Sequence, residues 1–296
     1  MSGATAIFED TQREDLGEWL SVAAGRLRDA GIDTARLDAR LLASFVLGWD
    51  PARVLAHPEH ALDGGEWERL QSVLVRRQQR QPLAVIVGRR EFWGLDFAVT
   101  SDTLVPRPES ETLIEAALAA DANREGTLNV LDLGTGSGCL LLALLSERPK
   151  ARGLGVDVSA AALKVAETNA ANLGLKARAE FRQSDWGEGV EGRFDLVLAN
   201  PPYVADGEFA ALEPEVTRFE PRLALSGGPD GLTGYRALAP QIGPKLKPGG
   251  RAFIEIGAAQ AGAVSALFED HGLAVVSIHT DLSGRPRVIE TQQVED

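Results

Sequence analysis

The sequence predicts an α/β protein in which a small helical bundle precedes a domain built on a mostly parallel, seven-stranded sheet. The chain has 296 residues, which exceeds the usual size of one domain, so we expect two domains. Residues 1–83 carry apolar residues at helical spacing without intervening strands, which predicts a bundle. Residues 108–296 alternate apolar runs with helical patterns, and this βαβα alternation produces a parallel sheet covered on both faces.

The N-terminal segment is predicted to be helical from about Asp15 to Gln81, where leucine and alanine recur at helical spacing. Glycine-containing breaks at 31–33 and 48–51 separate the helices, and a third helix is expected over 66–80. We interpret this bundle either as packing alone or as a module that docks a partner.

Residues 84–107 are expected to join the two domains as a β-hairpin. Two apolar stretches within 84–100 flank the charged residues 89–91, which predicts two strands with polar residues between them. A proline at an early helical position, with acidic residues in the first turn, predicts a helix that starts near Pro108.

The C-terminal domain is expected to contain seven strands with helices between them. The strands are predicted at 128–133, 152–156, 179–182, 195–199, 251–256, 273–278 and 287–291. The intervening helices are predicted at 139–146, 160–173, 231–246 and 259–269.

The composition excludes several classes of protein. Apolar residues make up 44% of the chain and charged residues 25%, as in soluble globular proteins. The net charge of −13 argues against a protein that mainly grips the nucleic-acid backbone, so no direct nucleic-acid substrate is expected. A single cysteine, Cys139, excludes an internal disulfide and a cysteine-based metal site, which fits a reducing compartment.

Other features point to a cytoplasmic monomer without membrane contact. The chain opens without a basic and apolar leader, no run approaches membrane-spanning length, and no heptad pattern indicates a coiled coil. His57 and His60 are close together, but a surface loop explains them better than a metal pair, and no metal is expected. The arginines from Arg76 to Arg90 are interpreted as a solvated face rather than a docking site.

A glycine-rich segment indicates a nucleoside cofactor. The first predicted strand runs directly into residues 132–138, Asp-Leu-Gly-Thr-Gly-Ser-Gly, and a helix follows. Glycines allow a sharp turn and a close approach of the backbone to a ligand. Asp157 ends the next strand about twenty residues later, where a carboxylate accepts hydrogen bonds from ribose hydroxyls.

Three details favour S-adenosylmethionine over NAD as this cofactor. The glycine spacing is Gly-x-Gly-x-Gly rather than Gly-x-Gly-x-x-Gly, and Asp132 precedes it where it would meet a cationic amino group. Asp185 and Trp186 follow the third strand, where they would supply an acceptor for the adenine amino group and a ring that stacks on the base. A turn residue and a core aromatic remain the alternative interpretations of these two residues.

The segment Asn200-Pro201-Pro202-Tyr203 follows the apolar run 194–199, so it lies at the tip of a buried strand. Two prolines end the ladder and hold the chain in a stiff, extended turn. Such a tip suits the alkylation of a planar NH₂ group. The Asn200 side-chain oxygen and the Pro201 carbonyl would each accept one N–H and turn the nitrogen lone pair toward an electrophile. Tyr203 would stack on the planar group. A plain strand-ending turn is the alternative.

Together, these motifs resemble a known family. Residues 132–138 with 200–203 are similar to the class I methyltransferases that act on planar nitrogens. Further motifs narrow the resemblance to the HemK/PrmC release-factor glutamine methyltransferases, and they lie at 92–93, 106–111, 184–186, 219–221 and 228–232. The resemblance runs from about residue 15 to residue 290 and is densest in the C-terminal two-thirds.

The resemblance implies a class I, Rossmann-like fold and an S-adenosylmethionine-dependent enzyme that methylates N5 of the glutamine in the Gly-Gly-Gln loop of class 1 release factors. S-adenosylhomocysteine would be the second product, and the bundle would dock the release factor. The 106–111 segment, with Arg107 and Glu111, would lie beside the pocket. The implied cofactor contacts are Gly134, Thr135, Gly136, Ser137, Gly138, Asp157, Asp185, Trp186 and Asn200. The residues implied to hold the glutamine are Asn200, Pro201, Pro202 and Tyr203, of which Asn200, Pro201 and Tyr203 are the catalytic candidates.

Three other functions remain open at this point. An amino-methyltransferase acting on adenine or cytosine in nucleic acid faces the same chemical problem, although the acidic chain has no basic insert in the sheet domain. A non-catalytic nucleoside-binding module would leave the Asn-Pro-Pro-Tyr tip unexplained. A nicotinamide dehydrogenase is the third and weakest alternative.

Overall fold

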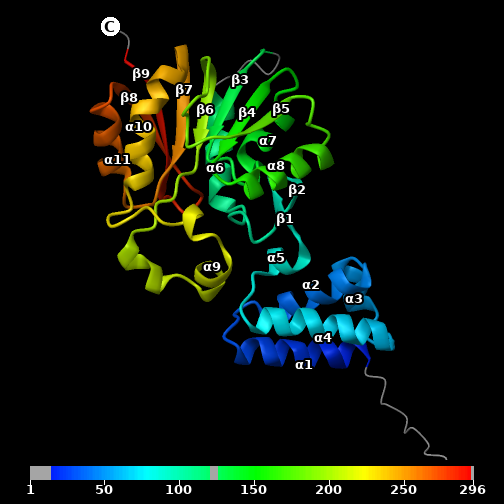
Figure 1. The fold of residues 1–296 in the computed structure, drawn as a ribbon. Coiled ribbons are helices and arrows are strands. Elements are labelled where there is room, and N and C mark those ends of the chain that lie inside the picture. Colours follow the sequence, from blue (N-terminus) through cyan, green and yellow to red (C-terminus); the bar gives the residue numbers. More distant parts are fainter. Residues whose placement is uncertain (1–14, 121–125, 295–296) are drawn as a thin grey trace, which may run out of the picture. The chain divides into compact units, whose positions relative to one another are not determined.

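The computed structural model describes residues 15–120 and 126–294. The chain divides into two compact units, Met1–Val87 and Gly88–Asp296. Each unit has its own hydrophobic core, and Figure 1 labels their elements.

The N-terminal unit is a helical bundle, as the sequence predicts. Its helices are α1 (Leu16–Asp29), α2 (Ala35–Leu47), α3 (Pro51–Ala56), α4 (Gly64–Gln78) and α5 (Leu83–Val87). Asp15, Asp50 and Asp63 begin α1, α3 and α4, because each carboxylate accepts a backbone N–H from the first turn. Trp19 and Leu74 are among the almost fully buried side chains of its core.

The expected hairpin is present, but its position differs from the prediction. The first apolar stretch forms helix α5 rather than a strand, and the strands are β1 (Arg89–Phe92) and β2 (Leu95–Ala98). The charged residues 89–91 therefore lie within β1 and not between the strands. The turn is formed by Trp93 and Gly94, whose φ angles are 55° and 68°. Two consecutive positive φ angles match the twist of a tight hairpin, which the apolar pattern alone could not locate.

The C-terminal unit contains the predicted seven-stranded sheet. Its strands are β3 (Asn129–Leu133), β4 (Arg152–Asp157), β5 (Ala179–Gln183), β6 (Phe194–Ala199), β7 (Leu246–Glu255), β8 (Leu273–Thr280) and β9 (Pro286–Gln293). The strand order is β5-β4-β3-β6-β7-β9-β8. Strands β3 to β7 pair in parallel, whereas β9 is antiparallel to both β7 and β8. The predicted fold class is confirmed.

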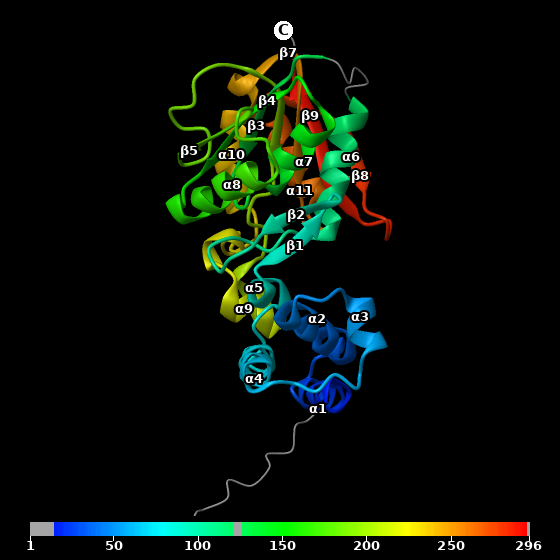
Figure 2. The same ribbon diagram turned by 90° about the vertical axis from the view of Figure 1, so that its right-hand side faces the viewer.

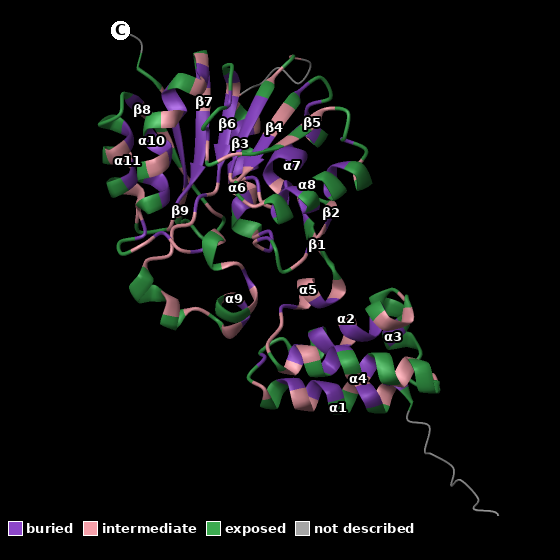
Figure 3. Cartoon of the chain, viewed as in Figure 1, coloured by how far each residue is buried: buried purple, intermediate pink, exposed green. Residues whose placement is uncertain are grey.

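Helices cover both faces of this sheet. The helices of the sheet domain are α6 (Glu111–Ala120), α7 (Cys139–Glu147), α8 (Ala160–Asn172), α10 (Thr233–Lys245) and α11 (Ala261–Glu269). Successive residues of a strand face opposite sides, so Val130 packs in the core with α6 and α7, and Leu131 packs in the core with α10 and α11. Figure 2 shows the central strands between these layers, and Figure 3 shows that most of their residues are buried.

A segment without a predicted element joins β6 to α10. It contains the short helices η2 (Asp206–Ala211), α9 (Pro214–Phe219) and η3 (Arg222–Ala224). Each spans six residues or fewer. Helices this short do not complete the periodic pattern that identifies a helix in a sequence, so the sequence gives no signal for them.

Candidate active site

The site lies where the order of the strands reverses. Strand β3 pairs with β4 on one side and with β6 on the other, so the loops that follow these strands leave in opposite directions and open a crevice between them. A cavity of about 420 Å³ occupies this place. The loops after β3, β4, β5 and β6 line it, together with parts of the 102–110 and 221–237 segments.

The glycine-rich loop turns sharply at the end of β3. The backbone N–H groups of Gly134 and Thr135 both donate to the Val156 carbonyl, at 2.9 Å each. Gly134 and Gly136 have φ angles of 75° and 55°, a region that residues with a Cβ rarely adopt. A Cβ on Gly134 would lie 3.3 Å from the ring of Trp186. The loop and the indole therefore form a cradle that only a glycine leaves open.

Asp132 lies beneath this loop and is fully buried. Its Oδ2 accepts a hydrogen bond from the Thr135 hydroxyl at 2.6 Å, and its Oδ1 has no partner among the described residues. Burial raises the pKa of Asp132 to about 7, while the bond from Thr135 lowers it. Thr135 lines the cavity and Asp132 does not. Asp132 would therefore act on a ligand through Thr135.

Asp157 ends β4 and lines the cavity. Its Oδ2 accepts from the backbone N–H of Gly136 and its Oδ1 from that of Ser159, both at 2.9 Å. A carboxylate oxygen has two lone pairs, so each oxygen can accept one further hydrogen bond. The carboxylate is thus fixed in place and can still bind hydroxyl groups of a ribose.

Asp185 and Trp186 follow β5 and both line the cavity. Asp185 is exposed, whereas Trp186 is half-buried and has a φ of 51°. The next residue, Gly187, donates its N–H to the Gln241 side chain at 2.9 Å. This bond ties the turn to α10 and holds the indole against the glycine-rich loop.

The Asn200 tip lines the same cavity as the glycine-rich loop. Asn200 and Pro202 line the cavity, and Pro201 is buried against Gly234 of α10, where a Cβ would lie 3.1 Å from the proline Cβ. The Asn200 Nδ2 donates to Ser110 Oγ at 3.3 Å. The tip is therefore rigid on its inner side and presents an amide to the cavity on its outer side.

Tyr203 does not line the cavity, in contrast to the stacking position that the sequence indicates. Its carbonyl accepts a hydrogen bond from Gln260 Nε2 at 3.0 Å, and its ring lies close to Gly257, where a Cβ would be 3.4 Å away. Burial raises the pKa of Tyr203 to about 12, so the phenol stays protonated at neutral pH. In this state Tyr203 supports the tip from behind.

The 106–111 and 219–221 motifs meet through an ion pair. Arg107 lines the cavity, and its Nη2 lies 2.7 and 2.9 Å from the two carboxylate oxygens of Glu220. Burial raises the pKa of Glu220, whereas Arg107 lowers it. Glu111 instead accepts from the backbone N–H of Trp93 at 2.9 Å and does not line the cavity. Arg107 thus belongs to the site, and Glu111 holds the hairpin turn.

Most of the predicted cofactor and substrate residues converge on this cavity. Those that line it are Gly134, Thr135, Gly136, Ser137, Asp157, Asp185, Trp186, Asn200 and Pro202. Gly138 begins α7 with a φ of 79° and packs against α8, where a Cβ would lie 3.2 Å from Ala166. Two residues at the site were given no individual role by the sequence, and one of them, Ser110, lines the cavity. Ser110 and Glu255 are both buried, and the Ser110 hydroxyl bonds to the Glu255 carboxylate. Ser110 lies in the 106–111 motif without an assigned role, and Glu255 belongs to no local pattern that would have identified it.

Comparison with known proteins identifies the family. Residues 18–88 match the family model of the PrmC N-terminal domain, and residues 110–218 match the methyltransferase small domain. The chain is 52% identical over 273 residues to a release factor glutamine methyltransferase from Cereibacter sphaeroides. The aligned residues cover 92% of this chain and 96% of that protein. The chain belongs to the release factor glutamine methyltransferase family.

Further relatives agree with this assignment. A release factor glutamine methyltransferase from Rhodospirillum rubrum is 48% identical over 274 residues, which cover 93% of this chain and 84% of that protein. The crystal structure of a methyltransferase from Pyrococcus furiosus has a TM-score of 0.50 at 16% identity, covers 75% of this chain and 96% of its own, and shares the fold. The resemblance drawn from the motifs is thus confirmed, and the chain is an enzyme of the release factor glutamine methyltransferase family.

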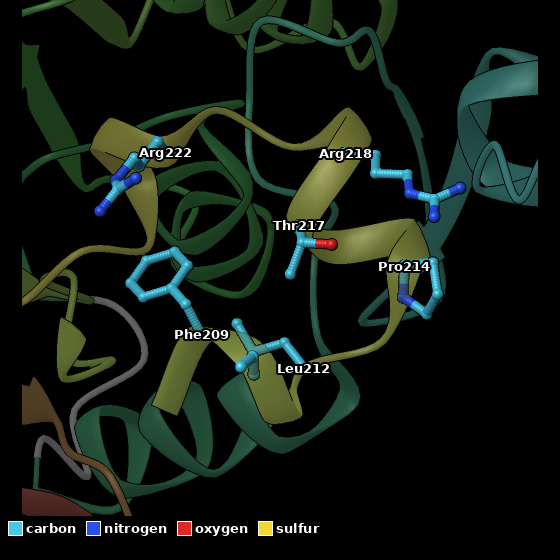
Figure 4. Close-up of a pocket in the computed structure, with 7 residues that line it drawn as sticks. Phe209, Leu212, Pro214, Thr217, Arg218 and Arg222 are labelled. Carbon is cyan, nitrogen blue, oxygen red and sulfur yellow. The ribbon is translucent and has the colours of Figure 1, made fainter. Parts of the chain in front are cut away.

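A second hollow in the C-terminal unit differs in its lining residues from the cavity at the ends of β3 and β6. It has a volume of about 470 Å³ and lies within the segment between β6 and α10. Figure 4 shows Arg222 beside the ring of Phe209, with Arg218 extending away from them. The Arg222 guanidinium lies 5.0 Å from the Phe209 ring centroid and 3.7 Å from the Asp206 carboxylate. This hollow lacks a glycine-rich loop and a side-chain amide. The cavity at the ends of β3 and β6 is therefore the candidate active site of this chain.

Within residues 15–120 and 126–294, none of the helices has both the length and the apolar content required to span a membrane.

Proposed function

We propose that this chain transfers a methyl group from S-adenosylmethionine to the side-chain nitrogen, N5, of the glutamine in the Gly-Gly-Gln loop of class 1 peptide chain release factors. The names of its relatives support the substrate. The observation that carries the proposal is the position of Asn200, whose amide lies on the wall of the cavity that the glycine-rich loop also lines. The N-terminal unit, which matches the PrmC N-terminal domain, is proposed to dock the release factor.

The residues of the cavity fit S-adenosylmethionine. The Gly134 cradle and the Trp186 ring would hold the nucleoside, Asp157 has free lone pairs for the ribose hydroxyls, and Asp185 is exposed for the adenine amino group. When bound, this cofactor supplies a methyl group attached to a positively charged sulfur, which makes the methyl group electrophilic.

The Asn200 tip would solve the main chemical difficulty of the reaction. The nitrogen of an amide is a poor nucleophile because its lone pair is delocalised. In our proposal, Asn200 Oδ1 and the Pro201 carbonyl accept one N–H each and orient the glutamine amide for in-line attack. The same two dipoles stabilise the positive charge that develops on the nitrogen. Pro202, which lines the cavity, is proposed to shape the glutamine pocket, and Tyr203 is proposed to support the tip. The amide proton leaves late, after the new bond has made it acidic.

The first test is intact-mass analysis of purified class 1 release factors after incubation with the full chain and S-adenosylmethionine. We expect a gain of one methyl group that maps to the glutamine of the Gly-Gly-Gln loop. DNA offered in a parallel reaction serves as the competing substrate. Methylation of DNA in place of the release factor would contradict the proposed substrate.

The second test removes the proposed acceptor. Asn200→Ala should lower kcat by about 10²-fold or more, because the lost contact acts mainly on the reacting group. The dissociation constant of the cofactor should stay near the wild-type value. Asn172→Ala, an exposed asparagine at the end of α8, is the matched control and should keep wild-type turnover. Near-normal turnover of Asn200→Ala would contradict the role assigned to Asn200.

A further inference from the structure

Two buried side chains behind Asn200 form a polar path that no step described above involves. Ser110 lies at the end of η1 (Pro108–Ser110) and is 3% exposed, and Glu255 ends β7 and is 1% exposed. Asn200 Nδ2 donates to Ser110 Oγ at 3.3 Å. The Ser110 hydroxyl in turn forms a hydrogen bond with the Glu255 carboxylate. Three segments that are far apart in the chain thus meet at the amide that lines the cavity.

The number of donors along this path determines how the Asn200 amide is oriented. An ionised carboxylate only accepts hydrogen bonds, and a serine hydroxyl has one hydrogen to donate. With that hydrogen directed to Glu255, Ser110 Oγ can only accept from Asn200. The amide must then turn its Nδ2 toward Ser110, which leaves Oδ1 for the cavity. The reverse orientation would place the carboxamide oxygen against an oxygen lone pair.

The surroundings of Glu255 keep this path in place. The Tyr235 hydroxyl donates to the Glu255 backbone carbonyl at 3.1 Å. Glu255 Oε2 has no hydrogen-bond partner in the described part of the chain. The charged and titratable groups that interact electrostatically with the carboxylate are Arg107, Glu109, Cys139, Tyr203, Tyr235 and Arg287. The two arginines favour the ionised carboxylate, whereas Glu109 opposes it.

We propose that Glu255, acting through Ser110, is a positioning residue that keeps the Asn200 side-chain oxygen directed at the substrate amide. This inference rests on the proposed function of Asn200 and extends it, through Ser110 on the wall of the cavity, to Glu255, which does not line the cavity. Asn200 then enters the reaction with its acceptor already oriented, so no binding energy is spent on turning the amide.

The path also predicts how the enzyme responds to pH. Burial raises the pKa of Glu255 to about 7, and the bond from Ser110 lowers it. Protonated Glu255 is a donor, so the Ser110 hydroxyl is free to donate to the Asn200 oxygen and the amide can turn over. Its NH₂ group would then face the N–H groups of the substrate. The kcat should therefore fall as the pH drops below about 7 and Glu255 takes up a proton.

The test compares the full-length wild type with Ser110→Ala, Glu255→Gln and Thr291→Ala. Thr291 is a fully buried hydroxyl residue in β9 that bonds to the Ala274 carbonyl, so its loss is a matched control for folding. kcat is measured from about pH 6 to 8.5 with saturating cofactor and release factor, and the cofactor dissociation constant is measured by titration. The side-chain ¹⁵N amide signals of Asn200, assigned by their loss in Asn200→Ala, are followed by NMR over the same range.

We expect Ser110→Ala to lower kcat about tenfold or more at pH 8 with the cofactor affinity unchanged. Glu255→Gln should show a reduced kcat without the decline below about pH 7, because no carboxyl remains to titrate. Thr291→Ala should keep the wild-type kcat. A wild-type kcat and pH profile in Ser110→Ala, or a retained acidic decline in Glu255→Gln, would overturn the inference.

The NMR signals separate this inference from the proposed function. A wild type that fails to methylate any release factor would refute the proposed function alone. The positioning path would then still be supported if the Asn200 amide signals shift as Glu255 titrates and lose that shift in Ser110→Ala. Signals that do not depend on pH in the wild type would overturn the path, whatever the substrate.

Discussion

Two buried acids at the ends of strands, Asp132 on β3 and Glu255 on β7, have similar surroundings but are assembled in different ways. Each is almost fully buried, leaves one oxygen without a partner among the described residues and bonds to a hydroxyl residue beside the cavity. The hydroxyl partner of Asp132 is Thr135, three residues away, whereas that of Glu255 is Ser110, on a distant segment. The first pair supports the glycine-rich loop and the second supports Asn200. The glycine-rich loop and Asn200 are thus supported in the same way, each by a buried acid that bonds to a hydroxyl residue.

The largest expected effect distinguishes the roles of the two acids, because Asp132 should affect cofactor binding and Glu255 should affect kcat. Asp132→Ala removes the charged partner of Thr135 and should weaken cofactor binding about 10- to 100-fold, since a hydrogen bond to a charged group contributes about 1.5–3 kcal/mol. The kcat at saturating cofactor should stay within about threefold of wild type. Calorimetric titration with the cofactor and steady-state kinetics measure the two quantities. A large loss of kcat with normal affinity would break the comparison, because it is the pattern expected of Glu255.

A glycine substitution tests the loop side of the comparison. Gly134→Ala places a Cβ at a φ of 75° and 3.3 Å from the Trp186 ring. We expect a loss of about 1–2 kcal/mol in unfolding free energy and about tenfold weaker cofactor binding. Gly174→Ala is the matched control, because its φ is 71° and no atom would lie within 4 Å of the new Cβ. Gly174→Ala should lose similar stability, measured by denaturant unfolding, and keep its cofactor affinity. Equal affinities in the two variants would argue against the cradle.

The difference between the two acids also explains how far the sequence predicts this molecule. Asp132 and Thr135 lie in one short segment that a strand feeds directly, so the glycine-rich loop can be located from local pattern. The same holds for Asn200, which follows a buried strand. Ser110, Asn200 and Glu255 are brought together only when η1, β6 and β7 adopt their places, and no local pattern contains all three. Most of the seven strands could be predicted because they are apolar runs bounded by polar residues, whereas β5 alternates apolar and polar residues.

The misplaced features have the same physical origin. The hairpin turn depends on the positive φ of Trp93, an unusual conformation for a residue with a side chain, and the sequence pattern placed the strands too early. Tyr203 was expected to stack in the pocket, but its place depends on Gln260 and Gly257, which lie more than fifty residues away. The position of a residue that depends on distant partners cannot be predicted from the local sequence pattern.

The two acids should make the unfolding free energy of the chain depend on pH in the same direction. Both have a pKa of about 7 in the folded chain, against ordinary values of 3.8 and 4.5. Between these values the folded state holds protons that the unfolded state has released, so these groups lower the unfolding free energy as the pH rises. Asp132→Asn should therefore raise the Tm relative to wild type by about 5 °C more at pH 8 than at pH 5. Calorimetry of the cofactor-free chain measures this difference. A Tm difference that is equal at both pH values would contradict the raised pKa.

The smallest effects would show whether the two paths are independent. In a double-mutant cycle on kcat, Ser110→Ala and Glu255→Gln should couple by about 1 kcal/mol, because residues in one hydrogen-bonded path do not act additively. Asp132→Asn combined with Glu255→Gln should be additive within about 0.5 kcal/mol, since the two acids act through different hydroxyl groups on different loops. Kinetics at saturating cofactor and release factor at pH 8 give both cycles. Strong coupling between the two acids would show that the loop and the Asn200 tip move as one unit, and the comparison would then describe a single network.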